Sequence, residues 1–388
     1  SGLDRFDRST GRFTNYDDRN GEGRLQRIHC LAERAPGELL VCANSGATLY
    51  RISESELRPI EDTEVPFMRT KCCNIFSFLY DCEGNFWFGS CYEGVEFHPA
   101  RNSFTCYATR KNDSSDRGKV VSAVCELKDG QYLLGNENDG ILLFDRHAGM
   151  VVPYRTAQNV GTAIYNVFSM LVDDQTLWIA AFHRGIEAVD LKSRTVKSYL
   201  ADPSDPSSRV FVLFRSSSGR IWAGTSVGLF YYDRFEDRFV TRDPKVRISD
   251  ITEDHAGRLW IATNEDGLYS YDARTDLLQH YRYDPDDPAT ISRNAVNTLA
   301  VDRTNRLWIG TNGYGLCSYN EKDGFVRHET LPLPSKIIQR IIPENDRLWI
   351  TTDRGLIVFY PATGQLKRYS RADGLHTEQF MSNSGILT

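Results

Sequence analysis

A short segment recurs along this chain and limits the possible folds more than any other feature. Its clearest copies are residues 306–311 (RLWIGT), 258–263 (RLWIAT), 220–225 (RIWAGT) and 347–352 (RLWITT). Eight anchor positions in this segment, 40, 87, 133, 178, 222, 260, 308 and 349, lie 38 to 48 residues apart. A glycine opens an apolar run six or seven residues after each anchor, at 46, 94, 140, 185, 228, 267, 315 and 355. Repeats of this length are typical of propellers and solenoids. We call each repeat a module.

Each module has the pattern of four short β-strands. In the seventh module, apolar and β-branched residues alternate over 295–301, 307–311, 315–319 and 325–329, with turn residues between these segments. No useful length of sequence has helical periodicity. Because one four-stranded unit buries too little apolar surface alone, modules must pack against like neighbours. We therefore expect an all-β fold, a β-propeller of four-stranded antiparallel blades.

The number of modules leaves two ways to close the propeller. Eight full modules are preceded by two strands in residues 1–17 and followed by one in 377–388. Either a seven-bladed ring is joined to part of a second ring, or one larger ring contains a split blade made from both ends. Residues 1–388 form one continuous repeat array in both cases. For the first case, counting back by modules predicts a boundary between propellers near residues 111–118, a polar stretch rich in turn residues.

Composition excludes several kinds of partner. The 46 Lys and Arg residues face 52 Asp and Glu residues, without a basic run, so we expect neither nucleic acid nor a polybasic contact with a membrane. No apolar stretch approaches the ~18 residues of a membrane span, so direct membrane insertion of this segment is not expected. The start without Met, within the repeat pattern, indicates a piece of a longer protein. Nine cysteines without a CxxC pair favour buried thiols over a disulfide framework or zinc site.

The repeat resembles that of a known family. The RLWIGT-type segment, the glycine that follows it and the later aromatic pair or Tyr-Asp are similar to the two-component regulator propeller repeat. Residues 283–294 (YDPDDPATISRN) resemble the family's linker between blades, residues 202–208 a shorter version, and residues 374–380 (GLHTEQF) the start of its last blade. The resemblance is specific in modules five to eight. It weakens toward the N-terminus, where modules one and three lack the tryptophan.

The resemblance implies a sensor function outside the cytoplasm. The family forms the sensor part of hybrid two-component systems, commonly in Bacteroidetes, which read glycan breakdown products and signal through a membrane helix to a histidine kinase. The kinase lies outside this sequence, so the resemblance implies a non-enzymatic, periplasmic domain of an inner-membrane protein. It also implies a homodimer through the parent receptor, since control of a kinase needs two chains.

Motifs that point to catalysis have structural explanations. Residues 224–228 (GTSVG) match the nucleophile elbow GxSxG, but that motif needs a strand-to-helix turn, whereas these residues connect two expected strands. Residues 254–260 (DHAGRLW) resemble a sialidase Asp-box with one residue too many, and we interpret them as a turn. The eight histidines show no metal-ligand spacing, so no metal or cofactor is expected. A carboxylate pair assembled from distant loops would not be visible in the sequence.

The loops between second and third strands are the predicted binding site. They differ from module to module and, in propellers, share one face with the linkers between blades, as expected of a binding surface on a rigid scaffold. A saccharide needs an aromatic face for its C–H groups and planar donors for its hydroxyl or acid groups. The candidates are Tyr92, Asn138, Phe182, His183, Arg184, Asn264, Tyr314 and Arg354. An oligosaccharide sensor is the leading prediction. A protein-interaction platform is the alternative, followed by a polysaccharide lyase or glycoside hydrolase.

Overall fold

The chain divides into two compact units. The computed structural model describes residues 3–16, 27–44, 46–52, 57–59, 75–80, 86–90, 95–98, 104, 120–128, 130–136, 140–154, 166–375, 377–382 and 385–386. The first unit comprises residues 1–105 and 372–374, and the second comprises residues 106–371 and 375–388. The predicted boundary at 111–118 lies outside the described residues and stays a prediction.

The first unit contains three antiparallel sheets among its described residues. β1 pairs with β2, the strands β3 to β6 form a four-stranded sheet, and β7 to β9 form a three-stranded one. The strands are β1 (Leu3–Asp7), β2 (Arg12–Tyr16), β3 (Ile28–Ala35), β4 (Glu38–Ala43), β5 (Gly46–Ile52), β6 (Leu57–Pro59), β7 (Ile75–Tyr80), β8 (Phe86–Ser90) and β9 (Val95–His98). The sheet β3–β6 is the first module, and β7–β9 belong to the second.

The described residues of the second unit form six four-stranded sheets, each with its strands in sequence order. The first three sheets comprise β10 (Val121–Lys128), β11 (Gln131–Asn136), β12 (Gly140–Asp145), β13 (Met150–Pro153), β14 (Val167–Asp173), β15 (Thr176–Ala181), β16 (Gly185–Asp190), β17 (Val196–Tyr199), β18 (Val210–Arg215), β19 (Ile221–Thr225), β20 (Leu229–Asp233) and β21 (Arg238–Arg242). The other three comprise β22 (Ile248–Glu253), β23 (Leu259–Thr263), β24 (Leu268–Asp272), β25 (Leu277–Tyr281), β26 (Val296–Val301), β27 (Leu307–Thr311), β28 (Leu316–Asn320), β29 (Gly324–Arg327), β30 (Ile338–Glu344), β31 (Arg347–Thr352), β32 (Gly355–Tyr360) and β33 (Gln365–Tyr369). Two 3-10 turns, η2 (Pro206–Ser208) and η3 (Arg371–Asp373), are the helical elements of the described residues.

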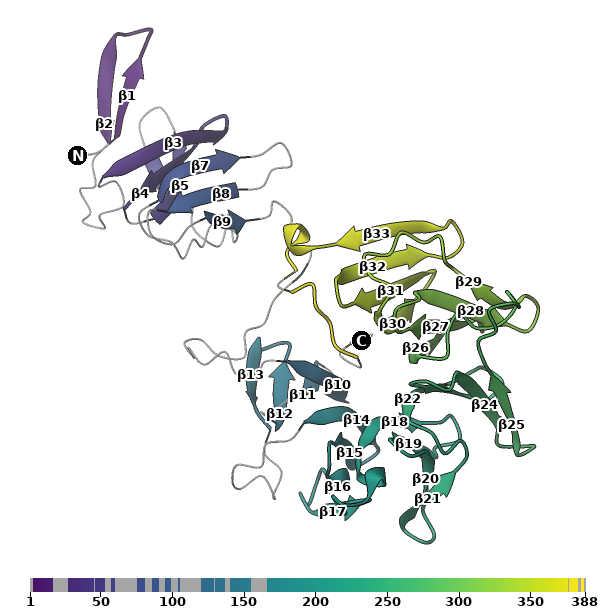
Figure 1. Ribbon diagram of the computed structural model, residues 1–388. Coiled ribbons are helices and arrows are strands. Elements are labelled where there is room, and N and C mark those ends of the chain that lie inside the picture. The colour runs from purple at the N-terminus through teal and green to yellow at the C-terminus, as the bar shows by residue number, and fades with distance from the viewer. Residues whose placement is uncertain are drawn as a thin grey trace. The chain divides into compact units, whose positions relative to one another are not determined.

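The six sheets are arranged as propeller blades. Figure 1 shows their first strands, β10, β14, β18, β22, β26 and β30, toward the middle of the unit. Each first strand contacts the first strand of the following sheet. The expected all-β propeller of four-stranded antiparallel blades is therefore confirmed, and the strands of the seventh module agree with the sequence prediction to within one or two residues at most ends.

Tryptophans of the repeated segment pack between neighbouring blades. Trp178, Trp222, Trp260 and Trp308 are buried and contact an aromatic ring of the next sheet, at 4.9 Å (Tyr232), 5.8 Å (Tyr271), 5.1 Å (Tyr319) and 6.1 Å (Phe359) between centroids. Burying a side chain of this size contributes on the order of 4 kcal/mol or more. These tryptophans therefore act as packing residues between blades.

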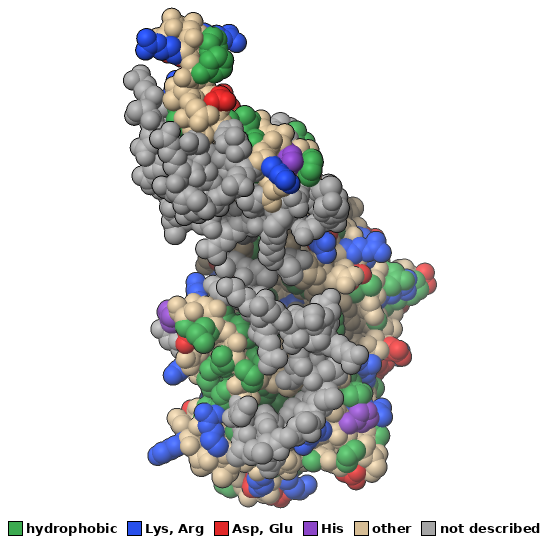
Figure 2. All heavy atoms as spheres, turned by 90° about the vertical axis from the view of Figure 1, so that its left-hand side faces the viewer, with side chains coloured by type: hydrophobic (Ala, Val, Ile, Leu, Met, Phe, Trp, Pro, Cys, Tyr) green, Lys and Arg blue, Asp and Glu red, His purple; other side chains and the backbone are tan. Residues whose placement is uncertain are grey.

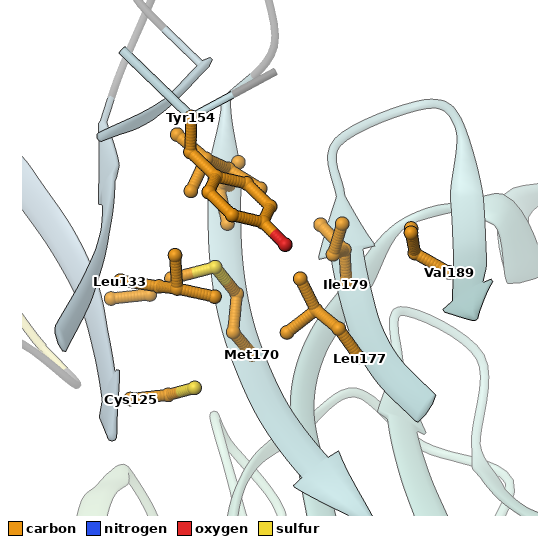
Figure 3. Packing of buried hydrophobic residues seen from close by; sticks show 10 residues of the cluster. Cys125, Leu133, Tyr154, Met170, Leu177, Ile179 and Val189 are labelled. Atoms are coloured by element: carbon orange, nitrogen blue, oxygen red, sulfur yellow. The ribbon is translucent and has the colours of Figure 1, made fainter. Parts of the chain in front are cut away.

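Aliphatic residues fill the remaining space between blades. Between the sheets β10–β13 and β14–β17, the side chains of Cys125 and Leu133 on one sheet face Met170, Leu177 and Ile179 on the other (Figure 3). Comparable buried clusters lie between each later pair of sheets in the second unit. The core is thus a series of layers between blades, as expected for units that cannot fold singly.

The described cysteines are free, and most are buried. Cys42, Cys125 and Cys317 are buried, and Cys30 is partly so. Burial raises the pKa of Cys125 to about 12 and that of Cys317 to about 11. These thiols therefore act as small apolar side chains, as predicted. The other five, Cys72, Cys73, Cys82, Cys91 and Cys106, lie outside the described residues.

The last residues differ from the sequence prediction. The predicted strand within 377–388 does not form in residues 377–382 and 385–386, the part that the structure describes. The segment still contacts the last blade, since the Phe380 N–H donates to the Thr352 carbonyl oxygen and the Ser382 hydroxyl to Gln339.

Candidate ligand-binding rim

The loops between second and third strands lie beside the starts of the first strands in the second unit. Backbone N–H groups of Phe182, Ser226, Asn264 and Asn312 donate to the carbonyl oxygens of Asn166, Arg209, Arg247 and Ala295, respectively, at 3.0 to 3.2 Å. Each oxygen belongs to the linker just before the first strand of the same sheet. These loops and linkers together form one face of the unit, which we call the rim.

Each first strand of the second unit has a β-bulge at its rim end. In each sheet, the pairing of the first strand with the second strand skips one residue of the first strand at this end. The skipped residues are Ser122, Phe168, Phe211, Ser249, Asn297 and Gln339. A bulge bends the strand and redirects the extra side chain. Here three of these side chains reach the next blade: Ser122 and Ser249 donate to the carbonyl oxygens of Val167 and Val296, both at 2.5 Å, and Asn297 donates to that of Ile338 at 3.1 Å.

Two of the bulged residues belong to a group of aromatic side chains on the rim. Phe168 lies 5.7 Å from Phe182 and 5.6 Å from Phe211, measured between ring centroids. His183 packs on Phe182 at 4.1 Å, and the guanidinium carbon of Arg247 lies 4.5 Å from the Phe211 centroid. Phe182 is 36% exposed and Arg247 is exposed. We call these five residues the aromatic cluster. It combines apolar ring faces with a cation at the surface.

The β15–β16 turn places three predicted residues in this neighbourhood. His183 has φ +59°, a left-handed conformation that turns the chain sharply between Phe182 and Arg184. Arg184 lies 3.4 Å from Glu187. Burial raises the pKa of Glu187, and the nearby charge of Arg184 opposes that rise. Arg184 is thus engaged within its own blade, and Phe182 and His183 carry the contact surface of this turn.

Asn264 lies next to a hydrogen-bonded group that shapes its loop. Its side chain is 3.4 Å from Glu265. The Tyr269 hydroxyl donates to Asp266 at 2.5 Å, and Arg282 lies 3.3 Å from the same carboxylate. Burial is the main cause that raises the pKa of Tyr269, and the hydrogen bond to Asp266 raises it further. Asp266 is therefore occupied by holding the loop, and Asn264 lies partly exposed beside it.

Tyr314 contacts Arg293, which the variation among the loops did not indicate as a site residue. The guanidinium carbon of Arg293 lies 4.0 Å from the Tyr314 ring centroid and 4.3 Å from that of Tyr283. Tyr314 is 49% exposed. Both Arg293 and Tyr283 belong to the linker 283–294, whose likeness to a family linker was the available signal in the sequence.

The remaining predicted residues make few contacts with these groups. The Arg354 N–H donates to the Thr352 hydroxyl, and Arg368 donates to the Arg354 carbonyl oxygen at 3.3 Å. Tyr92 and Asn138 lie outside the described residues. Within the described part of the chain, no contact joins the turns of Phe182, Asn264, Tyr314 and Arg354 to one another. The structure thus distributes the predicted residues along the rim, and it adds Phe168, Phe211, Arg247, Tyr283 and Arg293.

The catalytic motifs occupy structural positions. Ser226 lies in the turn between β19 and β20, where its hydroxyl donates to the Pro206 carbonyl oxygen at 2.6 Å. Asp254 accepts the backbone N–H groups of Ala256 and Arg258 and the indole N–H of Trp260, all at 3.0 Å. Both segments are turns between strands, as predicted. Among the residues that the structure describes, no group of His, Cys, Asp or Glu is placed to hold a metal ion.

Two grooves lie at the opposite ends of the strands. One of about 430 Å³ separates the hairpins of β22–β23 and β28–β29, and one of about 310 Å³ occupies the equivalent place one blade further on. Charged residues of the first groove pair with one another: Arg258 lies 3.3 Å from Glu321, and Arg306 lies 3.3 Å from Asp323. Because the second groove repeats the first, we attribute both to the spacing of the blades.

The distribution of surface charge does not point to a particular binding site. Figure 2 shows Lys and Arg side chains spread in small groups over the visible face. No helix within the described ranges is long and apolar enough to cross a membrane.

Comparisons with known proteins find one family whose repeat matches part of the chain. The sequence profile described as two component regulator propeller matches residues 243–265 and 290–313, which contain β22–β23 and β26–β27. These two stretches therefore match the two-component regulator propeller repeat, as their motifs indicated. A search of curated proteins found no match.

Solved structures share the fold at low sequence identity. The extracellular domain of BT3049 from B. thetaiotaomicron, described as a hybrid two component system, is 21% identical with a TM-score of 0.65, covering 98% of this chain and 50% of that one. The extracellular domain of BT4673 from the same organism is 20% identical with a TM-score of 0.57, covering 96% and 51%. A catalytically inactive virginiamycin B lyase from Staphylococcus aureus is 12% identical with a TM-score of 0.53, covering 67% and 86%. The chain spans about half the length of the two extracellular domains.

Proposed function

We propose that this chain is part of the extracytoplasmic sensor region of a hybrid two-component regulator. It binds an oligosaccharide on the rim and has no catalytic role itself. The signal passes to a histidine kinase outside this sequence, in a homodimeric parent receptor of the inner membrane. The repeat profile and the fold shared with two extracellular domains of such systems support this proposal.

The aromatic cluster is the observation that carries the proposal of a saccharide ligand. Sugar rings present C–H groups on one face and hydroxyl groups around their edge. Phe168, Phe182 and Phe211 offer apolar ring surface for the first, and His183 and Arg247 offer donors for the second. The rigid sheets on both sides hold these rings in place before any ligand binds, which limits the entropy lost on binding.

Calorimetric titration of the chain with a panel of plant, host and microbial oligosaccharides tests the function. We expect at least one oligosaccharide to bind without being cleaved. Phe182→Ala and Phe211→Ala should each weaken that binding by roughly 10-fold, because each removes an aromatic contact worth about 1 kcal/mol or more.

Phe235→Ala is the matched control. Phe235 is fully exposed in the turn between β20 and β21, at the other ends of the strands from the rim. Its loss should leave affinity unchanged. Cleavage of the bound sugar, detected by chromatography, would favour a lyase or hydrolase. Absence of binding to every saccharide would favour a protein-interaction platform. Equal binding by all three variants would contradict the placement of the site.

A further inference from the structure

A second group on the rim lies in the linker between the sheets β22–β25 and β26–β29. Arg293 packs its guanidinium against the rings of Tyr283 and Tyr314, at 4.3 and 4.0 Å from their centroids. A guanidinium covered on its faces by aromatic rings keeps its N–H groups for partners in its own plane. The geometry therefore leaves a planar set of donors beside the exposed ring of Tyr314.

Arg293 has no polar partner in the described part of the protein. It takes part in no ion pair and no hydrogen bond there, and its Nε is buried without an acceptor. The neighbouring cations differ: Arg282 pairs with Asp266, and Arg327 donates to the carbonyl oxygens of Asp284 and Asp287. A guanidinium without an acceptor is unfavourable in a partly buried place, so an acidic partner at its remaining N–H groups would stabilise it.

The rings around Arg293 are fixed by hydrogen bonds of their own. The Tyr283 N–H donates to the Asn294 side chain at 2.7 Å. On the other side, the N–H groups of Gly313 and Gly315, which flank Tyr314, both donate to the Lys336 carbonyl oxygen, at 3.1 and 2.9 Å. The site is thus formed before any ligand binds.

A second cation lies close to the same ring. The guanidinium carbon of Arg327 lies 5.1 Å from the Tyr283 centroid, so two cations contact one ring. Two acidic residues of the linker, Asp284 and Asp287, accept backbone N–H groups of their own turns, from Asp286 and Ala289. These carboxylates are therefore engaged locally, and neither forms an ion pair with Arg293 in the described structure.

We propose that Arg293 recognises an acidic group of the ligand, a carboxylate or a sulfate on a sugar. The planar fork of the guanidinium donates to two oxygens of that group, and the exposed face of Tyr314 packs against the sugar ring that carries it. This inference rests on the proposed saccharide-sensing function and specifies the chemical class of the saccharide, a uronic acid or a sulfated sugar.

Titration with matched probes tests this inference. The probes are galacturonate trisaccharide, a sulfated galactose disaccharide without carboxylate, and neutral galactotriose. We expect at least one acidic probe to bind more tightly than galactotriose. Arg293→Gln should weaken that binding by about 10- to 100-fold, the usual range for losing charge-assisted hydrogen bonds. Arg293→Lys should restore only part of it, because an ammonium group lacks the planar fork.

Arg238→Gln is the control, since Arg238 is exposed beside the β20–β21 turn and pairs with Glu236. Its binding should equal that of the unmodified chain. Should Arg293→Gln fail to fold, as judged by near-ultraviolet circular dichroism, Tyr314→Ala takes its place and should weaken the same acidic probe.

Each remaining outcome contradicts the inference. If acidic probes bind Arg293→Gln or Arg293→Lys as tightly as the unmodified chain, Arg293 does not take part in the binding site. Binding of neutral sugars alone would overturn the acidic class and leave the sensor function standing. Failure of these probes and of every saccharide in the wider panel would overturn both.

Discussion

At the residue scale, the Arg and Trp of the repeated segment share one carboxylate. Asp302 accepts the indole N–H of Trp308 at 2.7 Å and the backbone N–H of Arg306 at 3.1 Å. In the following sheet, Glu344 accepts from both side chains, Trp349 at 2.6 Å and Arg347 at 2.8 Å. The acidic residue in the first turn thus satisfies the polar end of a tryptophan whose rings pack in the core. The motif is therefore a structural device, and no reactive group is implied by it.

Removing the Asp302 carboxylate should destabilise the fold at neutral pH. Burial acts to raise the pKa of Asp302, but hydrogen bonds from Thr304, Trp308 and Arg306 outweigh it and lower the pKa below its ordinary value. Asp302→Ala should therefore lower the free energy of unfolding by about 1–3 kcal/mol at pH 7, because buried donors lose their acceptor. A carboxylate whose pKa is lower in the folded state stabilises above the unfolded pKa of about 3.9, and loses this effect as pH falls through the folded pKa.

Urea unfolding at pH 7 and pH 3, followed by tryptophan fluorescence, measures this effect. The difference between the unmodified chain and Asp302→Ala should shrink at the lower pH. Asp346→Ala is the control, since Asp346 is exposed in the equivalent turn of the next sheet. A difference that stays constant with pH would argue against the charged hydrogen bonds as its source.

At the scale of elements, the glycine of the repeated segment sets the distance between blades. A methyl group at Gly310 in β27 would lie 2.6 Å from Cγ2 of Ile338, the first residue of β30, and 2.7 Å from Cγ2 of Thr298. Gly224 in β19 has the same relation to Ile248, the first residue of β22. Ala262 occupies the corresponding place in β23, where the next sheet begins with Val296. The first strand of the following blade thus passes directly over this position.

Gly310→Ala should destabilise the protein by about 1–3 kcal/mol through overpacking. Ile338→Ala removes the Cγ2 atom that the new methyl group meets, although it leaves a cavity of its own. The double variant should therefore be less destabilised than the sum of the single variants, as chemical unfolding in a double-mutant cycle would measure. Gly364, with open space around it, is the control position, and Gly364→Ala should show no coupling to Ile338→Ala. Additive effects at Gly310 would argue against the close approach.

At the scale of the whole molecule, the two compact units have separate cores. Val41 and Tyr50 are buried within the first unit, and five layers between blades form the core of the second. Units with their own cores can unfold independently. The boundary predicted at 111–118 would separate them close to the division between residues 105 and 106.

Differential scanning calorimetry should resolve two unfolding transitions for the full chain. A shorter chain of residues 119–388 should keep one of them at nearly the same temperature, because the layers between its blades are retained. A single cooperative transition for the full chain, or a shorter chain without near-ultraviolet circular dichroism, would contradict a boundary at this position.

The amino-acid sequence alone determined the features that repeat within one module. Strand positions, the turns around Ser226 and Asp254 and the packing of Trp260 and Trp308 follow from alternation with period two and from spacing between anchors. These patterns are local, so they can be read from a single chain. The variable rim loops were visible in the same way, since Phe182, Asn264 and Tyr314 follow their anchors within the short segment that precedes the glycine of each module.

Only the tertiary structure decided which residues meet on the rim. A bulge in each first strand redirects Phe168 and Phe211, and nothing in a pattern of period two marks the skipped residue. Phe168 and Phe211 are 43 positions apart in the sequence, and they meet because adjacent blades bring the starts of their first strands together. In the same way, Arg293 meets Tyr283 and Tyr314 only when the linker is laid across the turn of the next blade. Contacts between blades depend on how sheets pack, which no single module encodes.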